Sequence, residues 1–395
     1  MRILFFHKNF PGRFGFMAAH LAANPENEVL FASCHQRSGA TVPAVRRVIV
    51  KSDAARRPAH EENYAQIWCA AMLSGKSRYA FLERLNAEFQ PHWVLSSAFG
   101  GISFFVPRAF PQAFHVFYAG LDHAPRTAEG FSEAKKVEWA MQGMQALQSR
   151  LCFAFSEEQR RLFPEALRPA VRIMTPWVDT DRMKPGGPAA FQHDTFAPAP
   201  ASELVSFDMQ GVAPDRASSL LKLVAALPGA RPSCCMVLCF GGNPVRRLFE
   251  AWHAGLPENL RCRVCLADFL RPDEYRDLFR ASSIYVCAET RPSPPPGRLE
   301  AMSCGAAVMM PAPATDAFAM DALLKPGENM LPFPSGSWEE QLEAVVEALE
   351  QPDRLAAIGA GARRDVVKAL SPQVLVPPHV ALLLEEYEAF RKERA

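Results

Sequence analysis

The chain has 395 residues, of which 49% are hydrophobic and 22% charged, with 43 Lys and Arg against 42 Asp and Glu. This length and composition allow two domains with full cores, and they exclude a disordered chain and a small disulfide-bonded scaffold. The formal net charge of +1 provides no overall positive field, so we expect no nucleic-acid partner.

The N-terminal residues and the lengths of the apolar runs indicate where in the cell the protein is expected. No uninterrupted apolar run reaches about 18 residues, the length that a membrane-spanning helix needs. The N-terminal residues lead into a strand-like run and lack the three-part pattern of a signal peptide. We therefore expect a cytoplasmic protein with no transmembrane segment, for which peripheral membrane contact stays open.

Ten cysteines are scattered along the chain. Cys262 and Cys265 have the spacing of half a zinc site, but the adjacent Cys234 and Cys235 are poorly spaced to supply the other half. Most of the other cysteines lie in apolar runs, where cysteine behaves as a small hydrophobic side chain. We expect no metal site and no disulfide framework.

The first half of the chain alternates short apolar runs with longer segments of helical periodicity. Strands are expected at 2–6, 28–33, 93–97, 113–118 and 151–155, and helices at 14–23, 64–89 and 133–147. Ser156 is a natural N-cap for a further helix. Short buried strands between helices are typical of a mostly parallel sheet that is covered on both faces.

A segment rich in Pro, Gly and Ala interrupts this alternation and predicts a domain boundary. We expect an N-terminal domain over 1–183, a linker over 184–203, a C-terminal domain over 204–376 and a final helix over 377–395 that crosses back to the first domain. The final helix is expected to begin at Pro377 and Pro378. In the second domain, strands are expected at 204–207, 234–240, 263–267, 283–287 and 306–310, and helices at 215–227, 272–281, 299–303, 338–349 and 353–370. Both halves therefore predict an α/β, doubly wound domain, with ligands at the carboxyl ends of the strands and a cleft between the halves.

Two loops that follow predicted strands are candidates for binding chemistry. Gly12, in the loop after the first strand, permits a tight turn or a close approach to a ligand. Neither loop carries a dinucleotide fingerprint or an ATP-binding P-loop motif. In the second loop, a helix is expected to begin near Arg298 with Glu300 in its first turn, where backbone N–H groups favour an anion. From spacing alone, Glu300 is either a ligand of sugar hydroxyls or an acid that merely favours the helix start.

Three segments, in the same order and spacing, resemble glycosyltransferase family 4. They are the opening strand with its Asn-Phe-Pro-Gly loop at 9–12, the segment Trp177–Pro185, and the helix segment Leu299–Val308. The first is similar to a bacterial branch of that family. The resemblance covers essentially the whole chain and implies the GT-B fold, in which two Rossmann-like domains face a cleft. It also implies a nucleotide-sugar donor on the C-terminal domain, an acceptor on the N-terminal domain and no cofactor or metal.

The resemblance assigns roles to individual residues. Glu300 matches the second glutamate of the family's Glu-x7-Glu motif, which binds the donor ribose, whereas Pro292 stands in place of the first. Of the basic pair that holds the donor diphosphate, Arg216 matches the second member and the neutral Gln210 stands at the first. The expected donor-binding set is completed by residues from the two loops: Asn9, Gly12, Gly297 and Arg298.

On the acceptor side, Asp122 and His123 follow a predicted strand and match the loop that contacts the transferred sugar, and they are the catalytic candidates. We expect transfer from a nucleoside diphosphate sugar to a hydroxyl of a glycan, lipid-linked or protein acceptor in bacterial glycan or glycoconjugate synthesis. The resemblance implies retention of anomeric configuration. Gln210 and Pro292 favour the alternative of a degenerate, glycosyltransferase-like binding or scaffold protein. A nucleotide-sugar epimerase of the same fold has no distinct signal.

Overall fold

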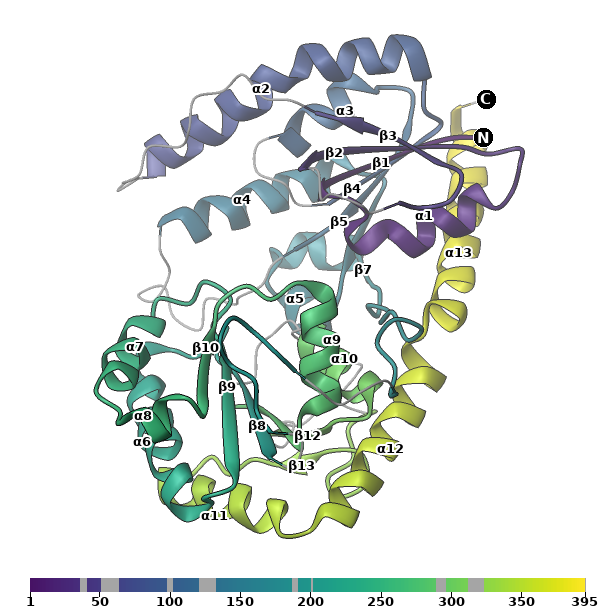
Figure 1. Cartoon of the computed structure of the whole chain (residues 1–395). Coiled ribbons are helices and arrows are strands. Elements are labelled where there is room, and N and C mark those ends of the chain that lie inside the picture. The colour runs from purple at the N-terminus through teal and green to yellow at the C-terminus, as the bar shows by residue number, and fades with distance from the viewer. Residues whose placement is uncertain are drawn as a thin grey trace. The chain divides into compact units, whose positions relative to one another are not determined.

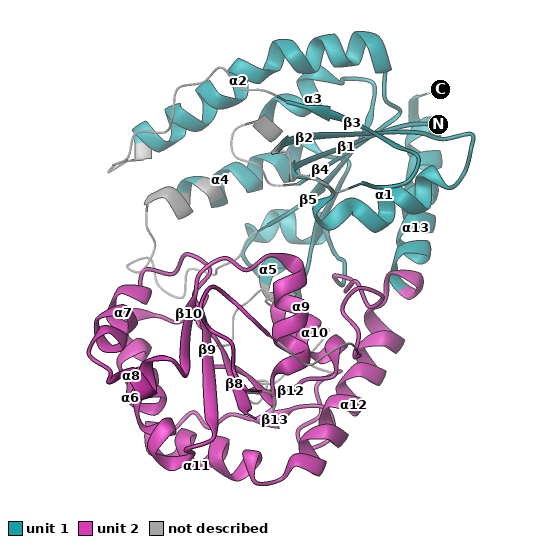
Figure 2. Ribbon diagram, in the orientation of Figure 1, with its two compact units in different colours: residues 1–175, 375–395 teal, residues 176–374 magenta. Residues whose placement is uncertain are grey.

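The structure, a computed structural model, describes residues 1–35, 41–50, 64–97, 102–120, 133–186, 191–199, 202–288, 296–311 and 323–394. The chain divides into two compact units, coloured separately in Figure 2. Unit 1 comprises Met1–Thr175 and Leu375–Ala395, and unit 2 comprises Pro176–Val374. Each unit is described by itself.

Unit 1 is built on a parallel sheet of seven strands in the order β3-β2-β1-β4-β5-β6-β7 (Figure 1). Its strands are β1 (Arg2–Asn9), β2 (Glu28–His35), β3 (Val45–Ile49), β4 (Trp93–Ser97), β5 (Phe114–Tyr118), β6 (Leu151–Ala154) and β7 (Val171–Ile173). Its α-helices are α1 (Gly15–Ala22), α2 (Tyr64–Phe89), α3 (Val106–Ala109), α4 (Glu133–Gln148), α5 (Glu157–Arg161) and α13 (Pro372–Arg394), which starts in unit 2. Short 3-10 helices lie at Gly12–Phe14, Ile102–Phe105 and Glu165–Ala170.

Alternate residues of the unit 1 strands pack on opposite faces of the sheet, as the period of a strand requires. Leu4 and Phe6 belong to a buried cluster with α2 and α3, whereas the ring of Phe5 lies 5.4 Å from that of Phe14. The sheet is therefore covered on both faces. This explains why its strands read as continuous apolar runs.

The last helix, α13, packs on the unit 1 sheet through aromatic and polar contacts. Tyr387 lies 5.5 Å, ring to ring, from Trp93 of β4. At the carboxyl end of β5, the buried hydroxyl of Tyr118 lies 2.8 Å from Nε2 of His379. Burial lowers the pKa of His379 to about 4, so at neutral pH its imidazole is uncharged where it shares this hydrogen bond with the phenol.

Unit 2 has a parallel sheet of six strands in the order β10-β9-β8-β11-β12-β13. Its strands are β8 (Glu203–Asp208), β9 (Cys234–Cys239), β10 (Val264–Ala267), β11 (Ile284–Cys287), β12 (Ala307–Met310) and β13 (Leu331–Pro332). Its helices are α6 (Pro214–Ala230), α7 (Arg246–Ala254), α8 (Glu258–Arg261), α9 (Pro272–Ala281), α10 (Pro296–Cys304), α11 (Trp338–Leu349) and α12 (Pro352–Leu370). If β8 is counted as the first strand of this sheet, the order reads 3-2-1-4-5-6, which is the Rossmann order.

Both faces of the unit 2 sheet are covered as well. Val205 and Phe207 of β8 pack in one cluster with α6, α11 and α12. Leu204 of the same strand packs in a second cluster with Leu278 of α9. Together with unit 1, this arrangement confirms the expected α/β fold of two Rossmann-like, doubly wound domains.

The division between the units differs from the prediction. It falls after Thr175 and again after Val374, whereas the sequence placed the first domain over 1–183 and the final helix at 377. The expected linker belongs to unit 2, because Phe191 and Phe196 are buried in its core beside β8 and β9. The composition of that segment predicted a loop correctly, but two aromatic side chains bind the loop to the second unit.

The start of the final helix is also corrected. Pro377 and Pro378 lie inside α13, which begins at Pro372 after the non-helical Ser371. A proline at the first helical position has no hydrogen bond to lose there, so Pro372 is well placed to start the helix.

One helical run among the described residues is long and apolar enough to cross a membrane, judged by length and composition alone. It is Pro352–Arg394, which joins α12 and α13 through Ser371 and in which an 18-residue window has a mean hydropathy of 1.3 and is 44% buried. Charged residues such as Arg354 and Glu385 interrupt this segment, so the lengths of the uninterrupted apolar runs did not predict it. Core helices pass the same test, and Leu355, Ile358 and Leu383 of this run are buried.

Candidate functional site

The strand order of unit 2 creates a switch point between β8 and β11, because the chain leaves these neighbours in opposite directions along the sheet. The loop after β8 leads into α6, and the loop after β11 leads into α10. Both loops leave the carboxyl edge of the sheet, where open α/β sheets bind their ligands. This edge carries the two residues that the sequence analysis singled out most strongly, Glu300 and Arg216.

Glu300 is the fifth residue of α10, since the helix begins at Pro296. The expectation that Glu300 lies in the first helical turn is therefore wrong, and with it the explanation that it merely favours the helix start. Its side chain is partly buried, and burial raises the pKa of its carboxyl to about 7. Arg182 opposes this rise in pKa and Asp179 adds to it. Near neutral pH, Glu300 is thus divided between its neutral and charged forms.

Arg182 is the cation that acts on Glu300, and the sequence analysis did not single it out. Its guanidinium forms an ion pair of 2.9 Å with Asp273 at the start of α9. Its backbone N–H donates to Oδ1 of Asp179 at 3.0 Å. The Asp273 carboxylate therefore holds the guanidinium at the start of α9, close enough to Glu300 to lower the pKa of that carboxyl.

Arg363 of α12 holds the Arg182 segment against α10. Its Nη1 lies 2.9 Å from the carbonyl oxygen of Thr180 and 3.0 Å from that of Met183. The same atom lies 3.0 Å from the carbonyl oxygen and 2.8 Å from Oγ of Ser303 in α10. The Ser303 hydroxyl also bonds to the Met183 carbonyl. One guanidinium thus joins the segment that carries Arg182 to the helix that carries Glu300.

Gln210, expected where the family has a basic residue, is held by the neighbouring loops. Its backbone N–H donates to Oδ1 of Asp208 at 3.0 Å, and its Nε2 donates to the hydroxyl of Tyr275 at 3.1 Å. Gly241, after β9, has φ +55, and a Cβ there would lie 2.7 Å from Cγ of Gln210. Burial raises the pKa of Tyr275, with Asp208 and Glu300 adding to the rise. Asp208, Gln210 and Tyr275 thus gather at this edge of the sheet, close enough to Glu300 for its charge to act on the Tyr275 phenol.

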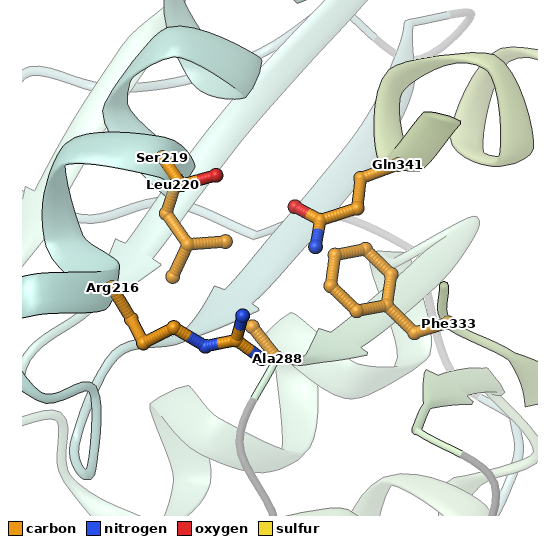
Figure 3. A pocket seen from close by; sticks show the side chains of 6 residues that line it. All are labelled: Arg216, Ser219, Leu220, Ala288, Phe333 and Gln341. Carbon is orange, nitrogen blue, oxygen red and sulfur yellow. The ribbon is translucent and has the colours of Figure 1, made fainter. Parts of the chain in front are cut away.

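Arg216, in the first turn of α6, lines a small pocket at the same edge of the sheet (Figure 3). Its side chain extends toward Ala288, the residue that follows β11, and Phe333 and Gln341 form the opposite wall. Gln341 is 3% exposed, and its Nε2 donates to the carbonyl of Pro334 at 3.1 Å. Arg216 therefore brings a cation to the β11 side of the switch point.

The other predicted residues of unit 2 lie at the start of α10. Gly297 allows this helix to approach Tyr285, because a Cβ on it would lie 3.1 Å from the tyrosine hydroxyl. Arg298 is only 2% exposed, so a nucleotide-sugar donor reaches its side chain only if the groups around it move. Its role in donor binding stays a prediction.

Asn9 and Gly12 belong to unit 1, where β1 ends at the switch point next to β4. The backbone N–H of Asn9 lies 3.0 Å from Nδ1 of His7. Gly12 has φ +51, and a Cβ there would lie 2.4 Å from the same Nδ1. Only glycine fits this close, left-handed turn over the imidazole. Burial lowers the pKa of His7 to about 4, so the ring is neutral near pH 7.

Several predicted positions lie outside the described residues. They are the catalytic candidates Asp122 and His123, and Pro292 of the loop before α10. Within the described part of the chain, no three His, Cys, Asp or Glu side chains gather as a metal site requires. Cys265 is buried and Cys262 is exposed.

Two family models match the sequence, one in each half. The model described as "Glycosyl transferase family 4 group" matches residues 25–183, and the one described as "Glycosyl transferase-like" matches residues 218–374. No curated protein matches the sequence.

Solved structures of low sequence identity share the fold over nearly the whole chain. HepE from Anabaena, in complex with UDP-glucose, has 15% identity and a TM-score of 0.68, covering 98% of this chain and 99% of that one. Sucrose-phosphate synthase from Thermosynechococcus elongatus has 12% identity and a TM-score of 0.67, with 98% and 100% covered. A UDP-N-acetylglucosamine 2-epimerase has 14% identity and a TM-score of 0.61, with 98% and 97% covered. At these identities the neighbours show the GT-B fold alone. Because glycosyltransferase models match in both halves and both sheets have the strand order of this fold, the chain belongs to the family 4-like glycosyltransferases.

Proposed function

We propose that this protein transfers a glycosyl group from a nucleoside diphosphate sugar to a hydroxyl acceptor, and that unit 2 binds the donor. The observation that carries the proposal is Glu300: a partly buried carboxyl beside the switch point of a Rossmann-type sheet, with a pKa raised to about 7. Perturbed acids gather at functional sites more often than elsewhere. The glycosyltransferase models and the UDP complexes of HepE support the choice of ligand.

In this proposal Glu300 accepts hydrogen bonds from the two ribose hydroxyls of the donor. Arg216 pairs with the diphosphate, assisted by the N-terminal N–H groups of α10 around Gly297. Gln210 leaves the diphosphate with one cation fewer than the family pattern provides. Arg182 keeps part of Glu300 ionised and so supports its role as a hydrogen-bond acceptor.

An exposed aromatic ring suits the base of the donor. Phe269, in the loop after β10, is 75% exposed. Gly242, with φ +83 in the loop after β9, allows its backbone to approach this ring, because a Cβ there would lie 3.1 Å from Cζ of Phe269. A nucleobase can stack on such a ring whatever its hydrogen-bonding pattern. We therefore propose Phe269 as the base platform.

The proposed reaction breaks the bond between the anomeric carbon and the diphosphate oxygen, and the leaving diphosphate takes the electron pair. The acceptor oxygen then bonds to the anomeric carbon, and its proton passes to the leaving diphosphate oxygen. We propose retention of configuration, no metal or cofactor, and a role in bacterial glycan or glycoconjugate synthesis, on the family resemblance. Asp122 and His123 remain the proposed catalytic residues. Activity that is unchanged in the presence of a chelator would support the metal-free reaction.

A panel of nucleoside diphosphate sugars tests the proposal, with thermal shift and donor hydrolysis as readouts. Calorimetric titration of Glu300→Ala should then show diphosphate affinity reduced by roughly 100-fold, since two charge-assisted bonds are lost. Arg216→Ala should weaken the diphosphate far more than the bare nucleoside. Glu339→Ala, in the first turn of α11, and Arg247→Ala, on the exposed face of α7, are matched controls.

A non-catalytic binding protein is the second candidate, and Gln210 favours it. This neutral side chain stands at a family basic position and is already bonded to Tyr275. Such a protein would bind a nucleotide sugar without turnover, so tight binding without hydrolysis or transfer would select it. An epimerase would instead convert the donor to an isomer, which the same panel detects by product analysis.

A further inference from the structure

Unit 1 contains a pocket of about 730 Å³. It lies at the edge of the unit 1 sheet opposite to the edge that carries the loop of Asn9 and Gly12. Arg2 begins β1 and His92 immediately precedes β4, so the pocket lies at the amino ends of the strands. We call it the basic pocket, lined among others by Arg2, His92, Tyr387, Phe390, Arg391 and Arg394. Its volume is in the range of small-molecule sites. None of the described residues of the proposed donor site lines it.

The charge of the basic pocket is positive. Three arginines line it, and among the described residues no Asp or Glu does. Glu388 lies beside it and contacts Arg391 at 3.4 Å. Arg2, the N-terminal amine and Arg391 all contribute, after burial, to a lowered pKa of His92, as expected where cations gather.

Each of the three arginines retains N–H groups that can donate hydrogen bonds to a ligand. Arg2 donates its Nε to the carbonyl of Gln90 at 2.8 Å, and Arg394 donates Nη1 to the carbonyl of Gln112 at 3.4 Å. A guanidinium has five N–H groups, so most of them remain for an anion. His92 adds a further donor: its Nδ1 accepts from the backbone N–H of Arg2 at 2.8 Å, which leaves the ring proton on Nε2.

The cations on α13 are held in place by aromatic rings. Arg391 lies 5.9 Å from the ring centre of Tyr387, and Arg394 lies 5.1 Å from that of Phe390. Both pairs are spaced by four residues and so share one face of the helix. Tyr387 itself packs against Phe114 at 5.7 Å. The rings fix the guanidinium groups and offer apolar surface to the carbon skeleton of a ligand.

We propose that the basic pocket binds a phosphorylated sugar. The arginines recognise the phosphate, for which their planar, multiple donors are suited. The side-chain amides of Asn86 and Gln112, which also line the pocket, recognise hydroxyl groups. A concave wall suits a small molecule better than the surface of an anionic membrane, so we commit to a soluble ligand.

Isothermal titration with glucose 6-phosphate, inorganic phosphate and glucose tests this proposal on the full chain. Glucose 6-phosphate should bind more tightly than phosphate, and glucose should bind weakest, because both halves of the ligand contribute. The double variant Arg391→Gln with Arg394→Gln should weaken glucose 6-phosphate by about 10- to 100-fold. Both side chains are exposed, so the variant should keep its melting temperature. Arg161→Gln removes an exposed arginine of α5 that pairs with Glu157, and it should bind as the wild type does.

Three results would overturn the proposal. The first is no binding of glucose 6-phosphate at millimolar concentration, and the second is unchanged binding by the double variant. The third is binding to vesicles of phosphatidylglycerol and phosphatidylcholine but not to glucose 6-phosphate, which would assign the pocket to a membrane. Binding that persists in saturating nucleoside diphosphate and in Glu300→Ala supports the proposal, because the proposed donor site is then excluded as the source.

Discussion

Replacing Glu300 by glutamine should change the pH dependence of the stability of unit 2. A carboxyl whose pKa rises from 4.5 to about 7 has its charged form disfavoured by about 3 kcal/mol. Below pH 4.5 the group is neutral in both the folded and unfolded states, so this term vanishes. Between pH 4.5 and 7 the unfolded state is ionised while the folded carboxyl still holds its proton, so the free energy of unfolding of the wild type falls across this range and levels off above it. Glu300→Gln keeps the shape of the neutral acid and removes this loss.

The size of the effect can be read from thermal unfolding. At pH 5 the variant should exceed the wild type by no more than about 1 kcal/mol, and at pH 8 by about 3 kcal/mol. For a unit of this size, each kcal/mol corresponds to about 2–4 °C in Tm, so the variant should melt roughly 6–12 °C higher at pH 8. Scanning calorimetry at the two pH values measures this difference. Equal Tm values for variant and wild type at pH 8 would refute the inference that burial perturbs Glu300.

Nucleotide binding should show the opposite response to the same variant. Ribose hydroxyls donate to the ionised form of Glu300, so affinity should rise with pH as that form becomes populated. With a pKa of about 7, the ionised fraction rises about tenfold between pH 6 and pH 8, and affinity for the nucleoside should follow. In Glu300→Gln, affinity should be weak and independent of pH. Using the nucleoside avoids titration of the phosphate itself, and a wild type without pH dependence would remove the ribose assignment.

Three further perturbations test the packing. Gly359→Ala should lower the stability of unit 2 by about 3 kcal/mol or more, because its Cβ would lie 2.0 Å from the carbonyl oxygen of Gly305. Gly229→Ala, with open space around it, should be neutral or slightly stabilising. Equal changes of Tm in the two variants would contradict this. Arg363→Ala should cost about 2–3 kcal/mol in urea unfolding, since it removes charge-assisted bonds to backbone carbonyls, and an unchanged midpoint would show that these bonds contribute nothing. Burial lowers the pKa of His379 to about 4, so wild-type stability should fall as pH drops from 6.5 toward 4; His379→Gln should lessen this fall, and an identical acid transition would refute it.

Much of the fold could be predicted because strong periodicity reports local structure. The helices expected at 64–89, 272–281 and 338–349 are observed with the same bounds. The strands that were missed are short or polar and lie at or near sheet edges: β3 contains two arginines, and β13 has two residues, one of them proline. Edge strands need only one apolar face and tolerate charge or proline, so their sequences resemble loops.

The residues of the proposed site also differ in how far the sequence could predict them. Glu300 and Arg216 could be proposed from the sequence because each follows a predicted strand within one loop and the start of one helix. Arg182 could not, since nothing near it in the sequence indicates that it acts on Glu300. It reaches Glu300 because Arg363, 183 residues away from Thr180, bonds to the backbone around it and to Ser303 of α10. These bonds are made to carbonyl oxygens, which every residue possesses, so no pattern of side chains along the chain could reveal them. The acid that defines the proposed donor site is therefore set by local sequence, whereas the cation that keeps it partly ionised is set by the folded arrangement of α10 and α12.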